Sequence, residues 1–235
     1  MHIFRFGWPF TRPPLRQRRL ARVLRAACRD PHYGQTLRGM GGAPALDRMP
    51  FTRLAEWNHG RRIPGVPETI AHPLKPELVA AVPEPGGGRY TAIAAPAAAL
   101  LAMAGLRRAV WPQAEFAVLA LERPGDAELS ETSRDLLWNV FQAPIYRVLL
   151  GFDGALLGHE CEAQNGLHAT SNAIFEERDG RIYVTSLTDR RNPCLRLETG
   201  LSGVLDDGLC ECGRPGARLT AAGSAMQADL SSAAD

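Results

Sequence analysis

The sequence is almost without lysine. Lys75 is the only lysine among 27 basic residues, and all the others are arginine. With a single lysine, the chain has only one side-chain amine to use in catalysis or binding. The formal net charge of +2 predicts no strong electrostatic partner and no specific binding of nucleic acid.

Long apolar runs are also missing. The longest apolar stretches are too short, or too interrupted by arginine and proline, to cross a bilayer. Arg18 and Arg19 are followed by further arginines rather than by an uncharged apolar region, which argues against an export signal. Five cysteines, an odd number, then indicate reduced thiols or metal ligands rather than a disulfide framework. We therefore expect a cytoplasmic protein.

The 235 residues suffice for one good core with a small appended lobe, and a hydrophobic content of 45% is ordinary for a globular protein. We expect three parts. Residues 1–80 carry an N-terminal helix and a segment rich in Pro and Gly, and residues 81–219 form an α/β domain. Residues 220–235 hold few large apolar side chains, which predicts a disordered tail.

Hydrophobic periodicity predicts four helices. They cover residues 15–28, a short stretch near 52–57, residues 95 or 96 to 108, and residues 131–141 with Ser130 as N-cap. In the first of them the apolar stripe of Leu20, Val23, Leu24 and Ala27 is surrounded by arginines. Such a helix packs on a core with a solvated arginine face, or it binds a membrane surface or nucleic acid.

Strands are expected at residues 116–121 and 143–150, and as a hairpin of residues 174–177 and 181–186 around Asp179-Gly180. Residues 83–88, with three consecutive glycines, are expected to form a linker or tight loop. The stretch 39–85 is expected to be mostly loop. The fold class predicted from these elements is α/β, a mixed sheet with flanking helices.

Two short clusters hold soft metal ligands. Cys161 and His168 flank a polar turn that contains Gly166, and Cys210 and Cys212 precede Gly213. Two local pairs of thiolates and imidazole, brought together by a fold, suit a closed tetrahedral zinc site of structural type. The alternative is that these cysteines are ordinary buried apolar residues, since C-x-C is a weaker signature than C-x-x-C.

Three further residues bear on this choice. His159 is a competing ligand that would point elsewhere on a strand, and Cys28 and Cys194 are expected to be plain core or surface thiols. A Cys161–His168 nucleophile pair is the catalytic alternative, but a thiolate held by zinc would not attack. The sequence contains neither a Gly-x-Ser-x-Gly nor a His-Glu-x-x-His motif.

The same part of the chain carries a family resemblance. Residues 133–214 resemble the phenylacetate–coenzyme A ligase branch of the adenylate-forming enzymes, and residues 31–33 and 49–52 resemble its opening more weakly. The residues that carry it are Pro144-Ile145-Tyr146, Glu160-Cys161-Glu162-x-Gln164-x-Gly166-Leu167-His168, Thr185-x-Leu187-Thr188, Pro193, Arg196, Thr199-Gly200 and Cys210-x-Cys212-Gly213-Arg214. The resemblance implies a large mixed α/β domain. It also implies a zinc site at Cys161, His168, Cys210 and Cys212.

The family activates a carboxylate with ATP and passes the acyl group to coenzyme A, but this chain departs from its ATP motifs. Residues 86–91 have no Ser-Gly-Thr pattern, and Phe152 replaces a hydroxyl donor beside Asp153. Leu201 stands where the family has an aspartate that holds the ribose, which costs a buried ribose hydroxyl roughly 1–3 kcal/mol. Lys75 cannot serve as the family's C-terminal catalytic lysine.

The resemblance and its gaps together predict a degenerate, non-catalytic relative with a structural zinc. It would act as a binding or accessory subunit for a complete ligase or an acyl carrier protein, without ATP or coenzyme A as cofactor. Asp153, Arg196 and Thr199 would mark a vestigial nucleotide site. One alternative is an AMP-forming acyl-activating enzyme with a rebuilt site. Another is a membrane-surface or nucleic-acid protein that uses the arginines of residues 1–29.

Overall fold

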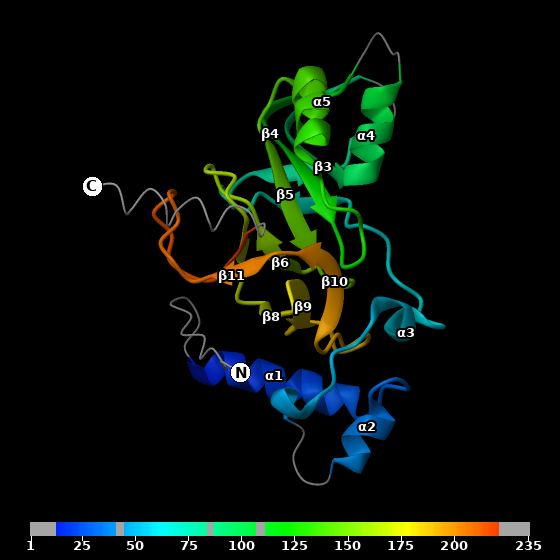
Figure 1. The fold of residues 1–235 in the computed structure, drawn as a ribbon. Coiled ribbons are helices and arrows are strands. Elements are labelled where there is room, and N and C mark those ends of the chain that lie inside the picture. The colour runs from blue at the N-terminus through cyan, green and yellow to red at the C-terminus, as the bar shows by residue number, and fades with distance from the viewer. Residues whose placement is uncertain (1–12, 41–44, 84–86, 107–110, 221–235) are drawn as a thin grey trace, which may run out of the picture.

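The structure is a computed structural model, and it describes residues 13–40, 45–83, 87–106 and 111–220 (Figure 1). A large mixed sheet occupies one half of the molecule and a small antiparallel sheet the other, with the N-terminal helices packed below the small sheet. The expected mixed α/β class is therefore confirmed. Within the described ranges, no helix combines the length and the apolar character needed to cross a membrane.

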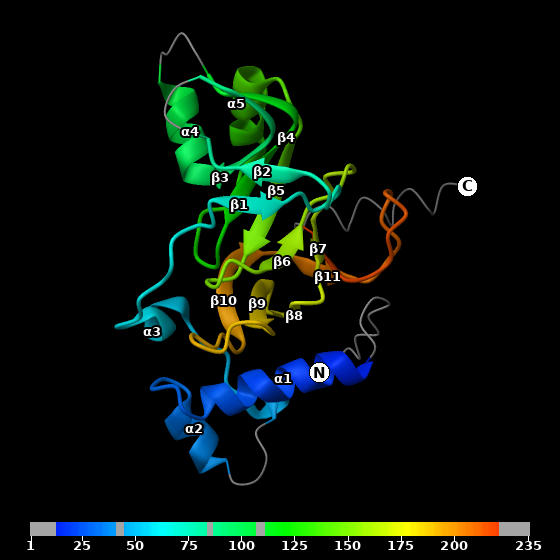
Figure 2. The same ribbon diagram turned by 180° about the vertical axis from the view of Figure 1, so that it is seen from behind.

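The large sheet has nine strands in the order β1-β2-β3-β4-β5-β6-β7-β12-β11 (Figure 2). Strands β2 to β5 are parallel, and every other neighbouring pair is antiparallel. The strands are β1 (Thr69–Ala71), β2 (Val79–Ala81), β3 (Arg89–Pro96), β4 (Gln113–Glu122), β5 (Ile145–Leu150), β6 (Leu156–His159), β7 (Leu167–Ala169), β11 (Val204–Asp206) and β12 (Arg218–Thr220).

Helices α4 (Ala97–Gly105) and α5 (Glu131–Phe141) cover one face of this sheet. Leu100 and Leu137 of the two helices share a buried cluster with Ile93 and Val118 of the strands. Ser130 caps α5 by accepting a hydrogen bond from the Ser133 amide, as its sequence position predicts. The apolar residues of both faces of the central strands are buried, which explains their nearly continuous hydrophobic composition.

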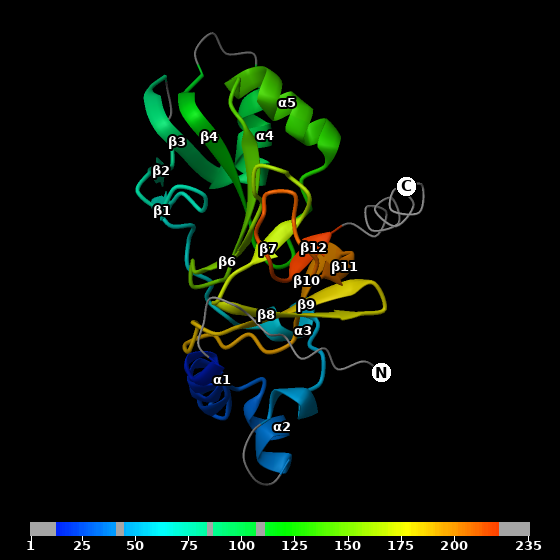
Figure 3. The ribbon, with the colours of Figure 1, turned by 90° about the vertical axis from the view of Figure 1, so that its left-hand side faces the viewer.

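The small sheet pairs β8 (Ala173–Arg178), β9 (Arg181–Ser186) and β10 (Leu197–Ser202). The β8–β9 turn has positive φ at Asp179 (54°) and Gly180 (73°), which is the backbone that an Asp-Gly hairpin turn requires. The predicted hairpin is therefore confirmed. Below this sheet lie α1 (Pro13–Ala27), α2 (Gly34–Gly39), a 3₁₀ turn at Leu46–Arg48 and α3 (Leu54–Asn58) (Figure 3).

Helix α1, the arginine-rich helix expected at residues 15–28, packs its apolar stripe on a core, as the first of its two interpretations predicts. Val23, Leu24 and Ala27 of α1 are buried with Trp57 and Leu195 in one cluster. The N-terminal part is further attached to the stretch that leads into β10. Tyr33 Oη donates to the Leu195 carbonyl and accepts from the Leu195 amide, at 3.2 and 3.1 Å.

Several sequence-based boundaries need correction. Ala95 and Pro96 complete β3, so the expected third helix begins at Ala97, and it ends at Gly105 rather than near residue 108, because Leu106 is already extended. Residues 89–91, expected to be loop, start β3. The stretch 39–85 also holds the 3₁₀ turn, β1 and β2, and β2 crosses the expected part boundary at residue 80.

Strands of three residues, such as β1 and β2, are too short for periodicity to detect. Of the other strands that the sequence did not reveal, β7, β11 and β12 also have three residues and β6 has four, whereas β10 has six. Thr220, expected to start the tail, is a buried residue of β12. The rest of the expected tail, and residues 84–86 of the expected linker, lie outside the described residues.

Candidate metal centre

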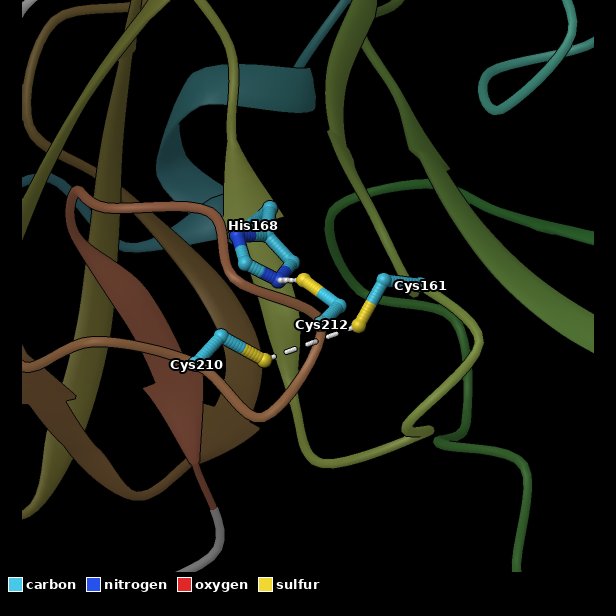
Figure 4. A group of neighbouring side chains, drawn as sticks. All are labelled: Cys161, His168, Cys210 and Cys212. Carbon is cyan, nitrogen blue, oxygen red and sulfur yellow. Dashed lines mark hydrogen bonds between the residues drawn. The ribbon is translucent and has the colours of Figure 1, made fainter.

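The four side chains singled out as metal ligands meet at one point of the fold (Figure 4). Cys161 follows β6, His168 lies in β7, and Cys210 and Cys212 come from the loop between β11 and β12. Their sulfur and nitrogen atoms all lie within 4.8 Å of one another. Among the described residues this metal cluster is the one group of three or more Cys, His, Asp or Glu side chains arranged to hold an ion.

Two distances within the metal cluster match a tetrahedral ion. Cys161 Sγ lies 3.6 Å from Cys210 Sγ, and Cys212 Sγ lies 3.5 Å from His168 Nε2. Zinc bonds of about 2.3 Å to sulfur and about 2.0 Å to nitrogen place two tetrahedral sulfurs about 3.8 Å apart, and sulfur and nitrogen about 3.5 Å apart. The donor set therefore fits zinc in its chemistry and in these two distances. Four protein ligands would leave no position open for a substrate.

The turn after Cys161 brings His168 back beside it. The Gln164 amide donates to the Cys161 carbonyl at 2.9 Å, and Gln164 has a positive φ of 50°. Gly166 has φ of 86°, and a Cβ there would lie 2.1 Å from the Leu219 carbonyl oxygen. Only glycine fits that approach, so this residue lets the turn pack against β12. The Gln164 side chain also donates to the Ile145 carbonyl at 3.0 Å, which ties the turn to β5.

The second loop is a tight turn closed on itself. The Gly213 amide donates to the Cys210 carbonyl at 2.8 Å, and the Cys210 amide donates to the Arg214 carbonyl at 3.2 Å. Gly213 has φ of 79°, a backbone that glycine adopts without strain. The turn orients both thiols of the C-x-C pair toward the Cys161–His168 side, as Figure 4 shows.

The protonation states of these groups are set by burial and neighbouring charge. Burial, together with the positive charges of His159, Arg214 and Arg218, lowers the pKa of His168 to about 4, so its imidazole is neutral near pH 7. Burial raises the pKa of Cys161 to about 12. Burial alone would also raise the pKa of Cys210, but hydrogen bonds from Cys212 and other neighbours lower it. A bound cation would supply the positive charge needed to deprotonate the thiol of Cys161, whose pKa is raised.

A buried arginine stands next to the metal cluster. Arg218 is 6% exposed and pairs in register with His168 on β7 and with Asp206 on β11. Its Nη2 donates to Asp206 Oδ2 at 2.5 Å, and its guanidinium is one of the groups that lower the pKa of Cys210. Three thiolates, a neutral imidazole and a divalent ion carry a net charge of −1, and Arg218, whose charge is shared with Asp206, offsets it only in part.

The residue before Cys161 belongs to a buried ionic network. Both Glu160 carboxylate oxygens accept from Arg134 of α5, at 2.7 and 3.0 Å, and one also accepts from the Arg147 amide at 2.8 Å. Arg147 in turn pairs with Glu122 at 2.9 Å. Glu160 therefore fixes the chain that enters the metal cluster against β5 and α5. The sequence shows Glu160 only as part of the Glu-Cys-Glu string and gives no signal for its partners.

Three other candidates lie outside the metal cluster. His159 directs Nδ1 to the Glu160 carbonyl at 2.8 Å, and its ring stacks at 6.1 Å from that of His168. Cys194 is buried in the core beneath α1, and Cys28 packs against the same core. The expectation that a strand position turns His159 elsewhere is wrong, because His159 pairs in register with His168 and its ring lies beside that ligand, although it is not one of the four clustered donors. The placements of Cys28 and Cys194 agree with plain thiols.

The three residues of the expected nucleotide site are each engaged elsewhere. Arg196 binds Glu176 at 2.6 Å, donates to the Met49 carbonyl at 2.7 Å and stacks over a phenylalanine ring. Thr199 is fully buried and donates to the Ile182 carbonyl at 2.8 Å. Asp153 is exposed in a turn, where it accepts from the Ala155 amide at 3.2 Å. The structure does not bring these side chains together around a shared cavity.

A small polar cavity of about 150 Å³ lies next to the turn that carries Gly166. Arg134, Arg147 and Leu201 are among the residues that line it. The leucine is 7% exposed and packs with the core of the small sheet. The site thus offers apolar surface at the position where the family resemblance implies a carboxylate.

No family model matches the chain, and no curated protein sequence matches it. Solved structures of a 2-hydroxyisobutyryl-CoA ligase do share its fold. In the open conformation with 2-HIB-AMP and CoA the TM-score is 0.58 at 11% identity, over 88% of this chain and 68% of that one. The postadenylation state with 2-HIB-AMP gives 0.59 at 12%, over 92% and 68%. The thioesterification state gives 0.58 at 11%, over 92% and 70%.

This likeness concerns the fold. The chain shares the fold of this CoA ligase over 88–92% of its length, and sequence identity of this size carries no conclusion about activity. The fold that the motif resemblance implies is therefore confirmed.

Proposed function

We propose that the chain is a non-catalytic relative of the phenylacetate–coenzyme A ligase branch, stabilised by a structural zinc ion held by Cys161, His168, Cys210 and Cys212. The observation that supports this most directly is the convergence of four soft ligands from two distant segments within 4.8 Å. Zinc would cross-link the turn after β6 to the loop before β12. Reduced thiols, as in the cytoplasm, are required for such a site.

The proposal that catalysis is lost rests on the polar groups near the expected nucleotide site, which already bind other groups of the protein. Arg196 and Thr199 are engaged within the protein, and Leu201 presents a side chain that accepts no hydrogen bond. Residues 89–91, the second half of the stretch nearest to the family's phosphate loop, form the start of strand β3. Phosphoryl chemistry depends on positioned charge, and these positions supply little of it. The remaining role is binding, as an accessory subunit of a complete ligase or an acyl carrier protein.

Elemental analysis of the purified protein tests the zinc site. We expect about one zinc ion per chain, lost when Cys161, Cys210 or Cys212 is replaced by serine and retained in the control Cys28→Ser. Cys28 is suitable because it is a thiol outside the metal cluster. Metal-free wild-type protein would contradict the proposal.

An ATP–pyrophosphate exchange assay with a broad panel of carboxylic acids tests the proposal that catalysis is lost. We expect no exchange above background. Turnover with any acid would instead favour the alternative, an AMP-forming acyl-activating enzyme with a rebuilt site. The zinc site and the loss of catalysis can be tested independently, because a structural ion at the metal cluster does not take part in acyl activation.

A further inference from the structure

The three thiols of the metal cluster come from two loops that are far apart in the sequence. Cys161 follows β6, whereas Cys210 and Cys212 lie between β11 and β12. The sulfur atoms of Cys161 and Cys210 face one another at 3.6 Å, although 49 residues separate them in the chain (Figure 4). A disulfide bond is about 2.05 Å long, so these two atoms need to approach by only about 1.5 Å to form one.

The other two thiols of the chain lie elsewhere. Cys194 is buried in the core beneath α1, and Cys28 packs against the same core. Neither belongs to the group of ligand atoms that lie within 4.8 Å of one another. Thiol chemistry at the metal cluster is therefore confined to its own three sulfurs.

These three thiols differ in their exposure to solvent. Cys161 is fully buried and Cys210 is 2% exposed, whereas Cys212 is only partly buried. A small reagent from solvent therefore reaches Cys212 first. Once oxidised, Cys212 would still lie beside two shielded thiols. An intramolecular reaction with one of them would then compete well with further, irreversible oxidation by the reagent.

We propose that the metal cluster is a redox switch in which hydrogen peroxide replaces the zinc ion by a disulfide between Cys161 and Cys210. This inference rests on the zinc site of the proposed function. A disulfide at these two residues leaves only Cys212 and His168 as ligands, and two ligands do not make the closed site that holds a structural zinc. Formation of the bond therefore releases the ion.

The reaction balances with peroxide as the oxidant. Water displaces the partly exposed Cys212 from the ion, and the freed thiolate attacks one peroxide oxygen. The O–O bond breaks, and the departing hydroxide takes a proton from solvent to become water. The Cys161 thiolate then attacks the resulting sulfenic sulfur, whose hydroxyl group leaves as a second water with another solvent proton.

Thiol–disulfide exchange then moves the bond to its final place. Cys210 attacks the Cys161 sulfur, 3.6 Å away, and releases Cys212 as a thiolate. In total, two thiolates lose two electrons and one peroxide is reduced to two waters. The new bond still joins the two loops. A cross-link between residues 49 positions apart stabilises a fold about as much as the zinc ion is expected to do.

Treatment of the zinc-loaded full chain with hydrogen peroxide tests the proposal. We expect release of about one zinc ion per chain, measured with a chromophoric chelator. Mass spectrometry should find the tryptic peptides 148–178 and 197–218, which contain Cys161 and the C-x-C pair, joined by a disulfide. Fragmentation between Cys210 and Cys212 should place the bond on Cys210. Reduction with dithiothreitol should restore zinc binding.

Thermal unfolding gives an independent readout. The oxidised chain should melt within a few degrees of the zinc-loaded chain and clearly above the reduced, chelated chain, because the disulfide takes over the cross-link. The matched control Cys28→Ser should respond like wild type. Cys161→Ser should form no bond between the two peptides.

Three results would overturn the switch. They are zinc that stays bound under peroxide, sulfinic acids without a cross-link, and a bond that rests on Cys212 instead of Cys210. Each of them contradicts the switch alone if the untreated protein carries zinc. A chain purified without zinc would contradict the zinc site and the switch together, so the two failures are distinguishable.

Discussion

The metal cluster and the segment of residues 193–199 both contain polar side chains that the sequence marks as functional, but the structure uses them differently. In the metal cluster, three thiols and an imidazole face one another, and their best hydrogen bonds are weak contacts of 3.5 and 3.6 Å that involve sulfur. In the 193–199 segment, the polar groups of Arg196 and Thr199 are satisfied by strong bonds within the protein.

The 193–199 segment serves as an attachment site for the N-terminal part of the chain. Trp57 donates to the Pro193 carbonyl at 2.8 Å, and the Thr52 amide donates to the Arg196 carbonyl at the same distance. Tyr33 forms two hydrogen bonds with the backbone of Leu195. Polar groups that already have partners gain little from a ligand, whereas converging groups with weak partners gain much. The metal cluster therefore stays a candidate for binding an ion, whereas Arg196 and Thr199 would gain little from a nucleotide.

Removal of the metal should have the largest effect. A ligand present at about a thousand times its Kd stabilises a protein by about 4 kcal/mol, so the chelated protein should melt about 8–16 °C lower. Cys210→Ser should produce a similar shift, since it removes a ligand at the centre of the cluster. Thermal unfolding with and without chelator measures both, and Cys28→Ser should melt like wild type in each condition.

If the chelator left the melting temperature unchanged in a zinc-loaded protein, the metal would not cross-link the two loops. The metal cluster would then resemble the 193–199 segment in being complete without a ligand.

Arg218→Met should weaken metal binding without removing any ligand. Substitutions around metal ligands cost about 10–100-fold in affinity, and here the lost cation leaves the net negative charge of the loaded site uncompensated. Competition with a chromophoric chelator measures the change. The conservative variant Arg218→Lys keeps the charge and should recover part of the affinity, whereas a purely steric role would leave both variants equally impaired.

The sequence predicts interactions between residues that are close in the chain better than contacts between distant segments. Cys161, His168, Cys210 and Cys212 form two local pairs, so their residue types and spacing suffice to nominate the site. The partners Arg218 and Asp206 are brought there by register between short strands that show no periodic pattern. Helices α1 and α5 are long enough for their apolar stripes to be recognised.

The sequence also gave no sign that Arg196 is held by Glu176 and Met49. Such contacts join segments separated by about 20 to 150 residues and depend on the final packing of the small sheet on the N-terminal helices. Motif resemblance identified where a nucleotide site belongs in the family. Only the three-dimensional contacts show how the same side chains are used in this chain.

Tyr33→Phe should have an intermediate effect. The substitution leaves the buried Leu195 amide without its partner, which costs about 1–3 kcal/mol in the free energy of unfolding. Burial also raises the pKa of Tyr33 well above its ordinary value of 10. The folded state thus keeps this proton when the unfolded chain has lost it, so stability is full below about pH 10 and falls as the pH rises further.

Urea unfolding of wild type and Tyr33→Phe across this alkaline range measures both effects. The variant should start lower at neutral pH, and the difference between the two proteins should shrink above about pH 10, because only wild type carries the titrating phenol. A constant difference would show that the Tyr33 hydroxyl is not buried against the 193–199 segment, and the attachment role of that segment would fail with it.

Asp153→Asn should have the smallest effect and tests the third residue of the expected nucleotide site, which lies outside the 193–199 segment. Asp153 is exposed and accepts one amide hydrogen bond within its turn, which an asparagine side-chain oxygen can also accept. We expect a change of less than about 0.5 kcal/mol in unfolding free energy. Calorimetry with ATP and magnesium should show no binding by wild type and none by the variant. Binding by wild type that the variant loses would mean that Asp153 holds a nucleotide, and the proposal that this chain has lost its nucleotide site would fail.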